Sequence, residues 1–495
     1  MMRKRAIGIV LAAAALALYL GLLTSEAMRV KPWNDEAMSA EAAYNLGTQG
    51  TTGVRFFDEK APNYPGITKH TYYIFPLQLC VLAVWYKAAG FSLLSTRVLS
   101  ILWTCLMLAA FYAFLEAVTE DRMIASLATV LCALDYQFMT AAAFGRYDMM
   151  VAALGFSAYA LYVRLRESHF RIALVAANAC VMAAGATHPN GLIYLIGLWF
   201  LILYFDRRRL RAMDLSTAAV PYVAGAAIWA PFVLQDWPSF RGQLLMNSSG
   251  RVGILHPWDT FVREIRYRYI TEFGLGAHSA GHSFAWVKLK ALSLVTYLLG
   301  IVGCLATRKI RQNMKLRPVL VLAGIHWAYM TFYENMKFSY YLVHLLPLYC
   351  ALLAVYTMHL WRSGATMRWA VAGLLALASL VQVGGILAKI RLNDYGKSYL
   401  PAVEFVRAHA LPADQVNASC SFGFEYGFDR NLMDDPSLGY YNHKQPEFIV
   451  EEEIYDGWWE ESKTTLPEVY AFFKRTLAGY DLIYDRDGYR VYRRR

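Results

Sequence analysis

The chain has 495 residues, of which 57% are hydrophobic and only 17% are charged. A water-soluble globule has about 45–50% apolar residues, and the excess here lies in long runs, so the composition excludes a soluble globule and predicts a polytopic α-helical membrane protein. The net charge of +11 falls in short basic loops, which indicate topology and contact with anionic membrane lipids rather than nucleic-acid binding.

The first apolar run covers residues 6–24 and follows the sequence Met-Met-Arg-Lys-Arg. The positive-inside rule keeps this basic end in the cytoplasm, so Asp35 and Glu36 lie on the far side, within about 15 residues of the bilayer. The two acids also stand at the start of a predicted helix, where Asn34 or Asp35 would serve as the cap. The pair is therefore either a helix cap or a group that acts on a substrate at the membrane surface.

Four basic loops should be cytoplasmic, and their parity sets the topology. They are the segments 164–171, 207–211, 308–317 and 362–368. Five apolar stretches precede Arg164, and an odd number would place that loop outside. We therefore predict that 72–90, which contains Pro76, Gln78 and Lys87, does not span the membrane and lies at the outer interface as an amphipathic helix.

With this assignment about eleven helices span the bilayer, each near the ~20 residues that a crossing requires. The predicted spans are 6–24, 94–118, 123–142, 149–166, 171–188, 191–205, 214–233, 287–306, 319–333, 340–360 and 369–388. Residues 1–391 then form a transmembrane domain with outer loops 25–93 and 234–286. The N-terminus is predicted to be cytoplasmic in a multi-pass protein of the cell (inner) membrane.

The tail, residues 392–495, has a different composition, because it is rich in Asp, Glu, Tyr and Asn and holds no spanning run. Apolar residues recur with helical spacing in 400–409 and 466–477. Asp487-Gly488 suits the two-residue turn of a hairpin between strands 481–486 and 489–493. We predict a small α/β domain on the extracytoplasmic side.

Four polar clusters fall on the same outer face, although up to 300 residues separate them. They are Asp35-Glu36, Gly145-Arg146-Tyr147-Asp148, Thr187-His188-Pro189-Asn190-Gly191 and Glu334 to Tyr341. Each has a simpler explanation: a helix cap, an Arg146–Asp148 ion pair at a helix start, a tight turn and a solvated loop. Their convergence favours a site, since a carboxylate can accept a proton from a hydroxyl and a cation such as Lys337 can stabilise a departing phosphate.

The order of these pieces resembles the membrane glycosyltransferases of the GT-C superfamily. The closest likeness is to the bacterial branch related to protein O-mannosyltransferases and to the aminoarabinose transferase of lipid A. The resemblance covers most of residues 1–360 in layout. In letters it rests on the Trp-Asn-Asp-Glu sequence after the first helix, the Arg-x-Asp turn after the third span, and the Lys337…Tyr340-Tyr341…Pro347 stretch.

The resemblance implies an inverting transfer of a sugar, hexose or pentose, from a polyprenyl-phosphate donor to an acceptor hydroxyl on a lipid, glycan or protein at the outer face. It makes Asp35 the catalytic base and Asp148 the second-loop acid, with Glu36 as a further candidate. Lys337 would be a cation near the lipid phosphate, and Arg251 a looser match. The remaining substrate-binding candidates are Lys69, His70, Arg146, His188, Asn190, Tyr340 and Tyr341.

The sequence departs from the family pattern at two places. The family often has an Arg a few residues after the acid pair, where this chain has Met38 and Ser39. It often has Lys-Pro-Pro or His-Pro-Pro before the interfacial helix, where this chain has Lys69-His70-Thr71. These differences leave the acceptor and the phosphate ligands open.

No His, Cys, Asp or Glu cluster has ligand spacing, so we expect no tightly bound cofactor or metal, although a divalent metal stays open. Trp458-Trp459-Glu460 invites comparison with the Trp-Trp-Asp motif of oligosaccharyltransferases, but Glu461 and Ser462 do not continue that motif. The main alternative function is a secondary transporter of a small polar solute or lipid-linked substrate, which would place its charges near the bilayer midplane on broken helices. A receptor or assembly scaffold is a third alternative. It would not require the polar clusters to converge.

Overall fold

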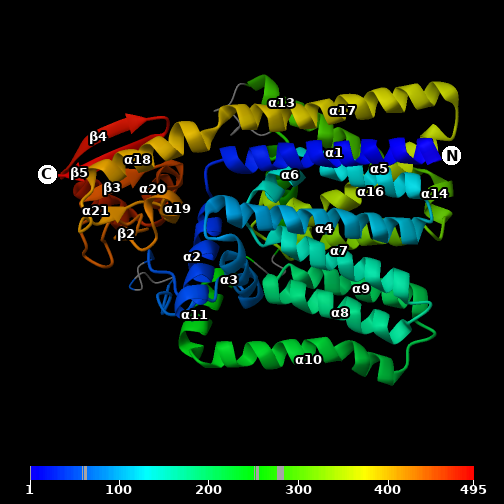
Figure 1. The fold of residues 1–495 in the computed structure, drawn as a ribbon, viewed down its shortest axis with the longest axis horizontal. Helices are drawn as coiled ribbons and strands as arrows, with labels where there is room; N and C mark the ends of the chain where they lie inside the picture. Colours follow the sequence, from blue (N-terminus) through cyan, green and yellow to red (C-terminus); the bar gives the residue numbers. More distant parts are fainter. Residues whose placement is uncertain are drawn as a thin grey trace.

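The computed structural model describes residues 2–57, 60, 64–249, 251, 253, 256–275 and 284–495. The chain forms a bundle of long helices with a small mixed α/β domain beyond one end (Figure 1). The two termini lie far from each other, the N-terminus at the free end of the bundle and the C-terminus in the small domain. The last helix of the bundle runs directly into that domain.

Most of the bundle helices overlap the predicted spans, but a short helix, Arg308–Gln312, lies in the basic loop 308–317, and the span predicted at 340–360 is α-helical only from Leu346. The bundle helices are α1 (Met2–Arg29), α4 (Leu93–Thr119), α5 (Arg122–Ala133), α6 (Tyr136–Ala143), α7 (Asp148–Leu165), α8 (Phe170–Thr187), α9 (Gly191–Asp206), α10 (Ala212–Leu234), α13 (Phe284–Ala306), α14 (Arg308–Gln312), α15 (Arg317–Phe332), α16 (Leu346–Trp361) and α17 (Ala365–Leu392). Within the described ranges, six helices are long and apolar enough to cross a membrane, or seven if the bent pair α5–α6 is one span. The number of about eleven spans stays a prediction.

The predicted span 123–142 is not a single helix. It is divided into α5 and α6, which meet at a bend of 62°. Asp135 forms the break, because its carboxylate caps α6 by accepting the backbone N–H of Phe138 at 2.8 Å. The same carboxylate also accepts from the Tyr297 hydroxyl and, at 2.8 Å, from the Gln382 amide. The Gly145-Arg146 turn follows α6 directly.

Two helices, α2 (Asn34–Gln49) and α3 (Pro76–Ala89), pack together at the end of the bundle next to the small domain (Figure 1). The 14 residues of α3 reach only about 21 Å, less than the ~30 Å of a bilayer core. This length agrees with the prediction that 72–90 does not span. The position of α3 at the outer interface stays a prediction.

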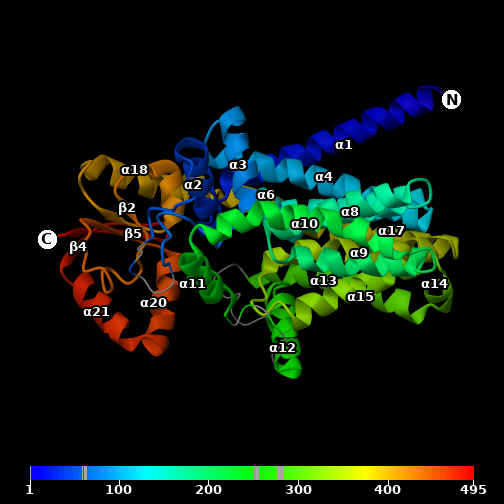
Figure 2. The ribbon, with the colours of Figure 1, turned by 90° about the horizontal axis from the view of Figure 1, so that it is seen from below.

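The segment after α10 contributes α11 (Trp237–Ser248), α12 (Pro257–Arg263) and a π-helical stretch, Glu264–Thr271. Figure 2 shows α11 between the bundle and the small domain, and α12 projecting from the side of the bundle. A 3₁₀ turn, Ser339–His344, precedes α16. The 3₁₀ turn carries two of the predicted site residues, Tyr340 and Tyr341.

The small domain has a five-stranded sheet with the order β2-β1-β3-β5-β4. Its elements are a π-helical turn Tyr395–Tyr399, α18 (Leu400–His409), β1 (Val416–Asn417), a 3₁₀ turn Cys420–Phe422, α19 (Gly423–Tyr426), β2 (Leu432–Met433), β3 (Phe448–Glu451), α20 (Glu453–Thr465), α21 (Pro467–Leu477), β4 (Tyr480–Arg486) and β5 (Tyr489–Arg494). β1 pairs in parallel with β2 and β3, and the remaining pairs are antiparallel.

The local predictions for the tail are confirmed. Helices occupy 400–409 and 467–477, and the hairpin β4–β5 turns at Asp487 and Gly488, whose φ angles are 50° and 82°. Two consecutive left-handed residues are what a type I′ turn requires, and Asp-Gly adopts them at low cost. The extracytoplasmic location of this domain stays a prediction.

A shared hydrophobic core joins the domain to the bundle. It contains Ala40 of α2, Leu82 of α3, Val403 of α18, Val416 of β1 and Phe448 of β3, all buried. The short connection after α1 adds an ion pair, Lys31 Nζ to Glu453 Oε2 at 3.3 Å. The domain is therefore packed against the bundle and can supply one wall of a site.

Candidate active site

A cavity of about 710 Å³ lies between the end of the bundle and the small domain. The bundle side contributes Asp35, Arg146, Arg251, Tyr340 and Tyr341, all named as candidates from the sequence. Four segments far apart in the chain thus meet at one place. This convergence agrees with the predicted gathering of polar clusters on one face.

Two carboxylates with a guanidinium between them lie at the centre of the bundle wall. Arg146 forms an ion pair with Asp35 through Nη1, and its Nε donates to Asp148 Oδ2 at 2.8 Å. The guanidinium lies 3.8 Å from the ring centroid of Tyr340 and 5.0 Å from that of Tyr147. Stacking and two ion pairs fix the orientation of this Arg.

The two acids of this group differ in exposure. The side chain of Asp35 is 43% exposed, whereas that of Asp148 is 2% exposed. Asp148 begins α7, where a carboxylate is favoured by the helix N-terminus. Its Oδ1 has no hydrogen-bond partner among the described residues. Asp35 is the carboxylate that a substrate can reach, and Asp148 holds Arg146 from behind.

Asp35 is not the cap of α2. The helix begins at Asn34, and the carboxylate of Glu36 accepts the N–H of Trp33 at 2.9 Å. The capping explanation therefore belongs to Glu36, and Asp35 is left facing the cavity.

Glu36 is fully buried and does not line the cavity. It receives two hydrogen bonds from Arg97, at 2.8 and 2.9 Å, and one from the N–H of Gly145 at 2.6 Å. A Cβ at Gly145 would stand 3.2 Å from Glu36 Oε1 and 2.5 Å from Thr96 Cγ2, so only glycine fits. Glu36 thus joins the Asp35 turn to the Arg146 turn, a positioning role in place of the catalytic one considered from the sequence.

His188 and Asn190 form the tight turn between α8 and α9. The His188 ring stacks on Tyr147 with centroids 4.4 Å apart and lies 5.7 Å from Tyr341. The N–H of Asn190 donates to His188 Nδ1 at 3.2 Å. Because a protonated imidazole has no lone pair to accept this bond, the ring is neutral and supports Tyr147.

Lys337, predicted to contact a lipid phosphate, does not line the cavity. Its side chain is 1% exposed, and Nζ donates to the carbonyls of Met330 at 2.9 Å, Thr331 at 2.7 Å and Glu334. Nζ also lies 3.2 Å from Glu264 Oε2. The alternative explanation, a solvated loop, therefore does not hold at Lys337, whose side chain is buried.

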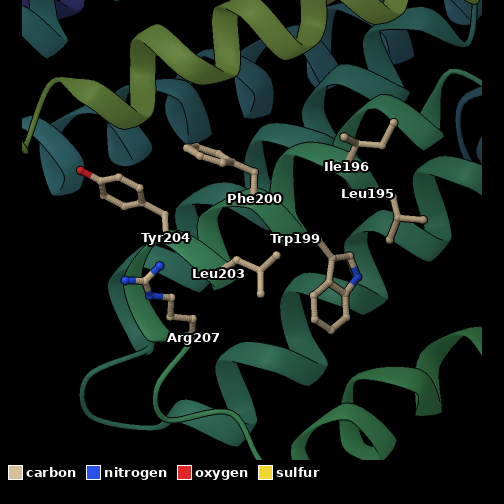
Figure 3. A pocket seen from close by; sticks show the side chains of 7 residues that line it. All are labelled: Leu195, Ile196, Trp199, Phe200, Leu203, Tyr204 and Arg207. Atoms are coloured by element: carbon tan, nitrogen blue, oxygen red, sulfur yellow. The ribbon is translucent and has the colours of Figure 1, made fainter. Parts of the chain in front are cut away.

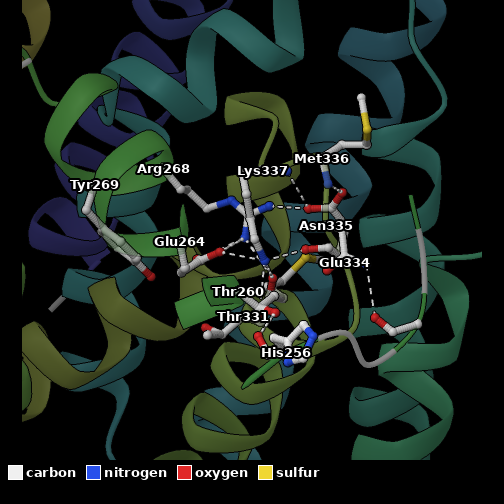
Figure 4. A network of polar contacts seen from close by, with 12 residues as sticks. His256, Thr260, Glu264, Arg268, Tyr269, Thr331, Glu334, Asn335, Met336 and Lys337 are labelled. Carbon is white, nitrogen blue, oxygen red and sulfur yellow. Dashed lines mark hydrogen bonds and ion pairs between the residues drawn. The ribbon is translucent and has the colours of Figure 1, made fainter. Parts of the chain in front are cut away.

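Lys337 belongs to a closed ion cluster (Figure 4). Arg268 donates to Glu264 at 2.7 Å and pairs with Glu334 through Nη2. The cluster reaches the cavity indirectly, because the adjacent Asn335 N–H donates to the carbonyl of Arg251 at 2.9 Å. It therefore holds the backbone of Arg251. Arg251 lines the cavity, and no carboxylate pairs with it within the described ranges.

Lys69 and His70 also lie apart from the cavity lining. The His70 ring packs near Phe232 of α10, with centroids 6.1 Å apart, and its carbonyl accepts from Gln243 of α11 at 2.9 Å. Lys69 is exposed. His70 thus links the first loop to α10 and α11.

The opposite wall of the cavity does not follow from the sequence. It comes from the small domain and includes Asp434, Asp435, Tyr455 and Trp458. Trp458 faces the cavity, whereas Trp459 is buried and donates from Nε1 to the carbonyl of Pro436 at 2.8 Å. The local sequence gives no sign of this wall, because it depends on how the domain packs on the bundle.

A second concavity, of about 780 Å³, lies on the face of α9 (Figure 3). Its lining is apolar except for Tyr204 and Arg207, and it contains no carboxylate. An apolar hollow on an apolar helix suits lipid chains rather than proton transfer. Within the described part of the chain, no group of three or more His, Cys, Asp or Glu is placed to hold a metal ion.

No family model matches the chain, and no curated protein matches it in sequence. Solved structures do match. ArnT from Cupriavidus metallidurans bound to undecaprenyl phosphate aligns with a TM-score of 0.62 at 12% identity, over 97% of each chain. The archaeal oligosaccharyltransferase AglB from Archaeoglobus fulgidus, in complex with an inhibitory peptide and a dolichol-phosphate, aligns with a TM-score of 0.54 at 15% identity, over 97% of this chain and 74% of that chain.

Both of these proteins have the GT-C fold, so the resemblance predicted from the sequence is confirmed for the fold. At 12–15% identity the likeness shows the fold alone. The reaction has to be argued from the cavity and its charged groups.

Proposed function

We propose that this chain is an inverting glycosyltransferase that moves a sugar from a polyprenyl-phosphate donor to an acceptor hydroxyl at the membrane surface. The observation that carries the proposal is Asp35, an exposed carboxylate held by the buried Arg146 at the wall of a 710 Å³ cavity. Its structural neighbours bind undecaprenyl phosphate and a dolichol-phosphate, and these ligands support a lipid phosphate as the leaving group.

The proposed reaction is a single displacement. Asp35 accepts the proton of the acceptor hydroxyl as its oxygen attacks the anomeric carbon. The new C–O bond forms on the face opposite the phosphate, the old C–O bond breaks, and polyprenyl phosphate leaves with the bonding electrons. Arg251, on the same wall of the cavity, stabilises the departing phosphate. Arg146 keeps Asp35 in place throughout.

The test is turnover by the purified protein in lipid nanodiscs, with undecaprenyl-phosphate-linked sugars labelled by growing cells on radioactive glucose. We expect release of undecaprenyl phosphate, abolished in Asp35→Asn. Asp259→Asn is the matched control, because Asp259 is another exposed acid in the first turn of a helix but lies outside the cavity. Equal loss in both variants, or none in Asp35→Asn, contradicts the proposal.

The alternative of a secondary transporter is favoured by one observation, the broken helix α5–α6 with a buried Asp135 at the break. A transporter would carry a solute into liposomes without consuming a lipid-linked sugar. Flux of a polar solute that depends on Asp135, together with intact lipid-linked sugars, would replace the glycosyltransferase proposal.

A further inference from the structure

The two walls of the cavity differ in charge. The bundle wall carries Arg146 and Arg251 beside Asp35, whereas the wall from the small domain carries Asp434 and Asp435. Across the described residues of that domain, no Lys, Arg or His lines the cavity. A lipid phosphate therefore meets cations only on the bundle wall. The other wall is left for the second substrate.

The two carboxylates of the small domain are fixed by neutral donors. Asp434 accepts from the N–H of Cys420 at 2.8 Å and from the Tyr455 hydroxyl at 3.1 Å. Asp435 accepts from the N–H of Gly439 at 2.8 Å. Neither forms an ion pair with any residue that the structure describes. Because no cation compensates them, their negative charge acts on whatever enters the cavity.

Aromatic rings flank these acids. Trp33, Phe57, Tyr64 and Trp458 line the cavity, and Phe57 and Tyr64 stack with centroids 4.4 Å apart at an angle of 9°. A carbohydrate offers C–H faces that pack on rings and hydroxyls that donate to carboxylates. A phosphate offers only acceptors and a charge of the same sign, so this wall repels it.

We propose that the wall formed by Asp434, Asp435 and Trp458 is the acceptor subsite, and that it selects an uncharged carbohydrate over one with a phosphate near the reacting hydroxyl. The inference rests on the proposed function and adds the class of acceptor. The acceptor hydroxyl reaches Asp35 from the side of the small domain, while the donor phosphate stays with Arg251. Inversion requires the two oxygens to lie on opposite faces of the anomeric carbon, so the sugar would be held between the acceptor and the donor phosphate.

The experiment compares two acceptor pools with one labelled donor. Bacterial envelope glycolipids are separated by anion exchange into an uncharged fraction and a phosphorylated fraction, and equal amounts are offered with the labelled undecaprenyl-phosphate sugars. We expect at least about tenfold more label in the uncharged fraction. Equal or greater labelling of the phosphorylated fraction overturns the inference. If the labelled donor is not consumed in either reaction, the proposed function itself is overturned. That outcome is distinct from equal labelling of the two fractions, in which the donor is consumed.

A charge variant isolates the wall from the rest of the protein. Leu466 lines the cavity on the same side and is 41% exposed, so it tolerates a polar replacement. Leu466→Lys should raise labelling of the phosphorylated fraction, relative to the uncharged one, by about three- to tenfold. The matched variant Leu466→Gln should leave that ratio unchanged. The same ratio in both variants contradicts charge selection by this wall.

Discussion

Two groups of charged residues lie close together at one end of the bundle, and they differ in how far solvent reaches them. In the Asp35–Arg146–Asp148 group, one carboxylate is 43% exposed to a cavity. In the group of Glu264, Arg268, Glu334 and Lys337, no side chain is more than 4% exposed (Figure 4).

The two groups also differ in net charge. The open group has two acids and one cation, so it keeps an excess negative charge. The closed group has two acids and two cations, which neutralise each other. An excess charge next to a cavity can accept a proton, whereas a balanced and buried cluster can only hold the backbone around it. We therefore propose that the open group carries the chemistry and that the closed group positions the surrounding backbone.

The largest expected effect comes from Asp35→Asn. Removing the base should lower transfer by about 10²- to 10⁴-fold. Folding should be retained, because Glu36 and not Asp35 caps α2. Turnover of labelled donor and a thermal unfolding curve measure the two quantities. Near-normal transfer by the folded variant would move the catalytic role to Asp148.

Lys337→Met should act on stability instead. The variant leaves an uncompensated carboxylate in the closed group, at a cost of about 3–5 kcal/mol in the free energy of unfolding. The double variant Lys337→Met/Glu264→Gln restores the balance and should recover more than half of that loss. If Lys337→Met instead kept its stability and raised the KM for the lipid-linked sugar, Lys337 would be a contact of the lipid phosphate.

Arg251→Ala should weaken use of the donor. One charge-assisted contact to a phosphate is worth about 1.5–3 kcal/mol, so the KM for the lipid-linked sugar should rise roughly 10- to 100-fold. Arg251→Lys, which keeps the charge, should recover part of this. An unchanged KM in Arg251→Ala would remove Arg251 from the donor site.

Asp434 is intermediate between the two groups, since it is a buried carboxylate without a cation. Burial raises its pKa to about 6. The folded state therefore holds this proton more tightly than the unfolded state, so the stability contributed by Asp434 is greatest below about pH 4 and falls as the pH rises through about 6. The loss should be about 2–3 kcal/mol. Unfolding curves of wild type and Asp434→Asn at pH 4 to 7 should diverge by that amount, and parallel curves would contradict it.

The sequence was sufficient for what depends on local pattern and parity. The helices, the Asp487-Gly488 hairpin and the meeting of Asp35 with Arg146 follow from periodicity, turn chemistry and the basic loops. The role of Lys337 did not follow, because the polar loop 334–341 gives no sign that it folds inward onto Glu264. A charge in a short loop has the same appearance in the sequence whether it is solvated or buried.

The cavity wall from the small domain could not be predicted for a different reason. Asp434 and Trp458 reach the cavity only because α2 and α3 share a core with the small domain. That packing is set by apolar residues, such as Ala40 and Val403, that lie hundreds of residues apart in the chain. Local patterns predict the elements of the domain but not the face that it turns towards the bundle.

The most direct test of the proposed chemistry is a cryo-EM map of the Asp35→Asn protein in nanodiscs with undecaprenyl phosphate bound. We expect phosphate density in the 710 Å³ cavity, within hydrogen-bond distance of the Arg251 guanidinium and facing residue 35. Phosphate density beside Lys337, or at the Arg207 end of the concavity on α9, would contradict it.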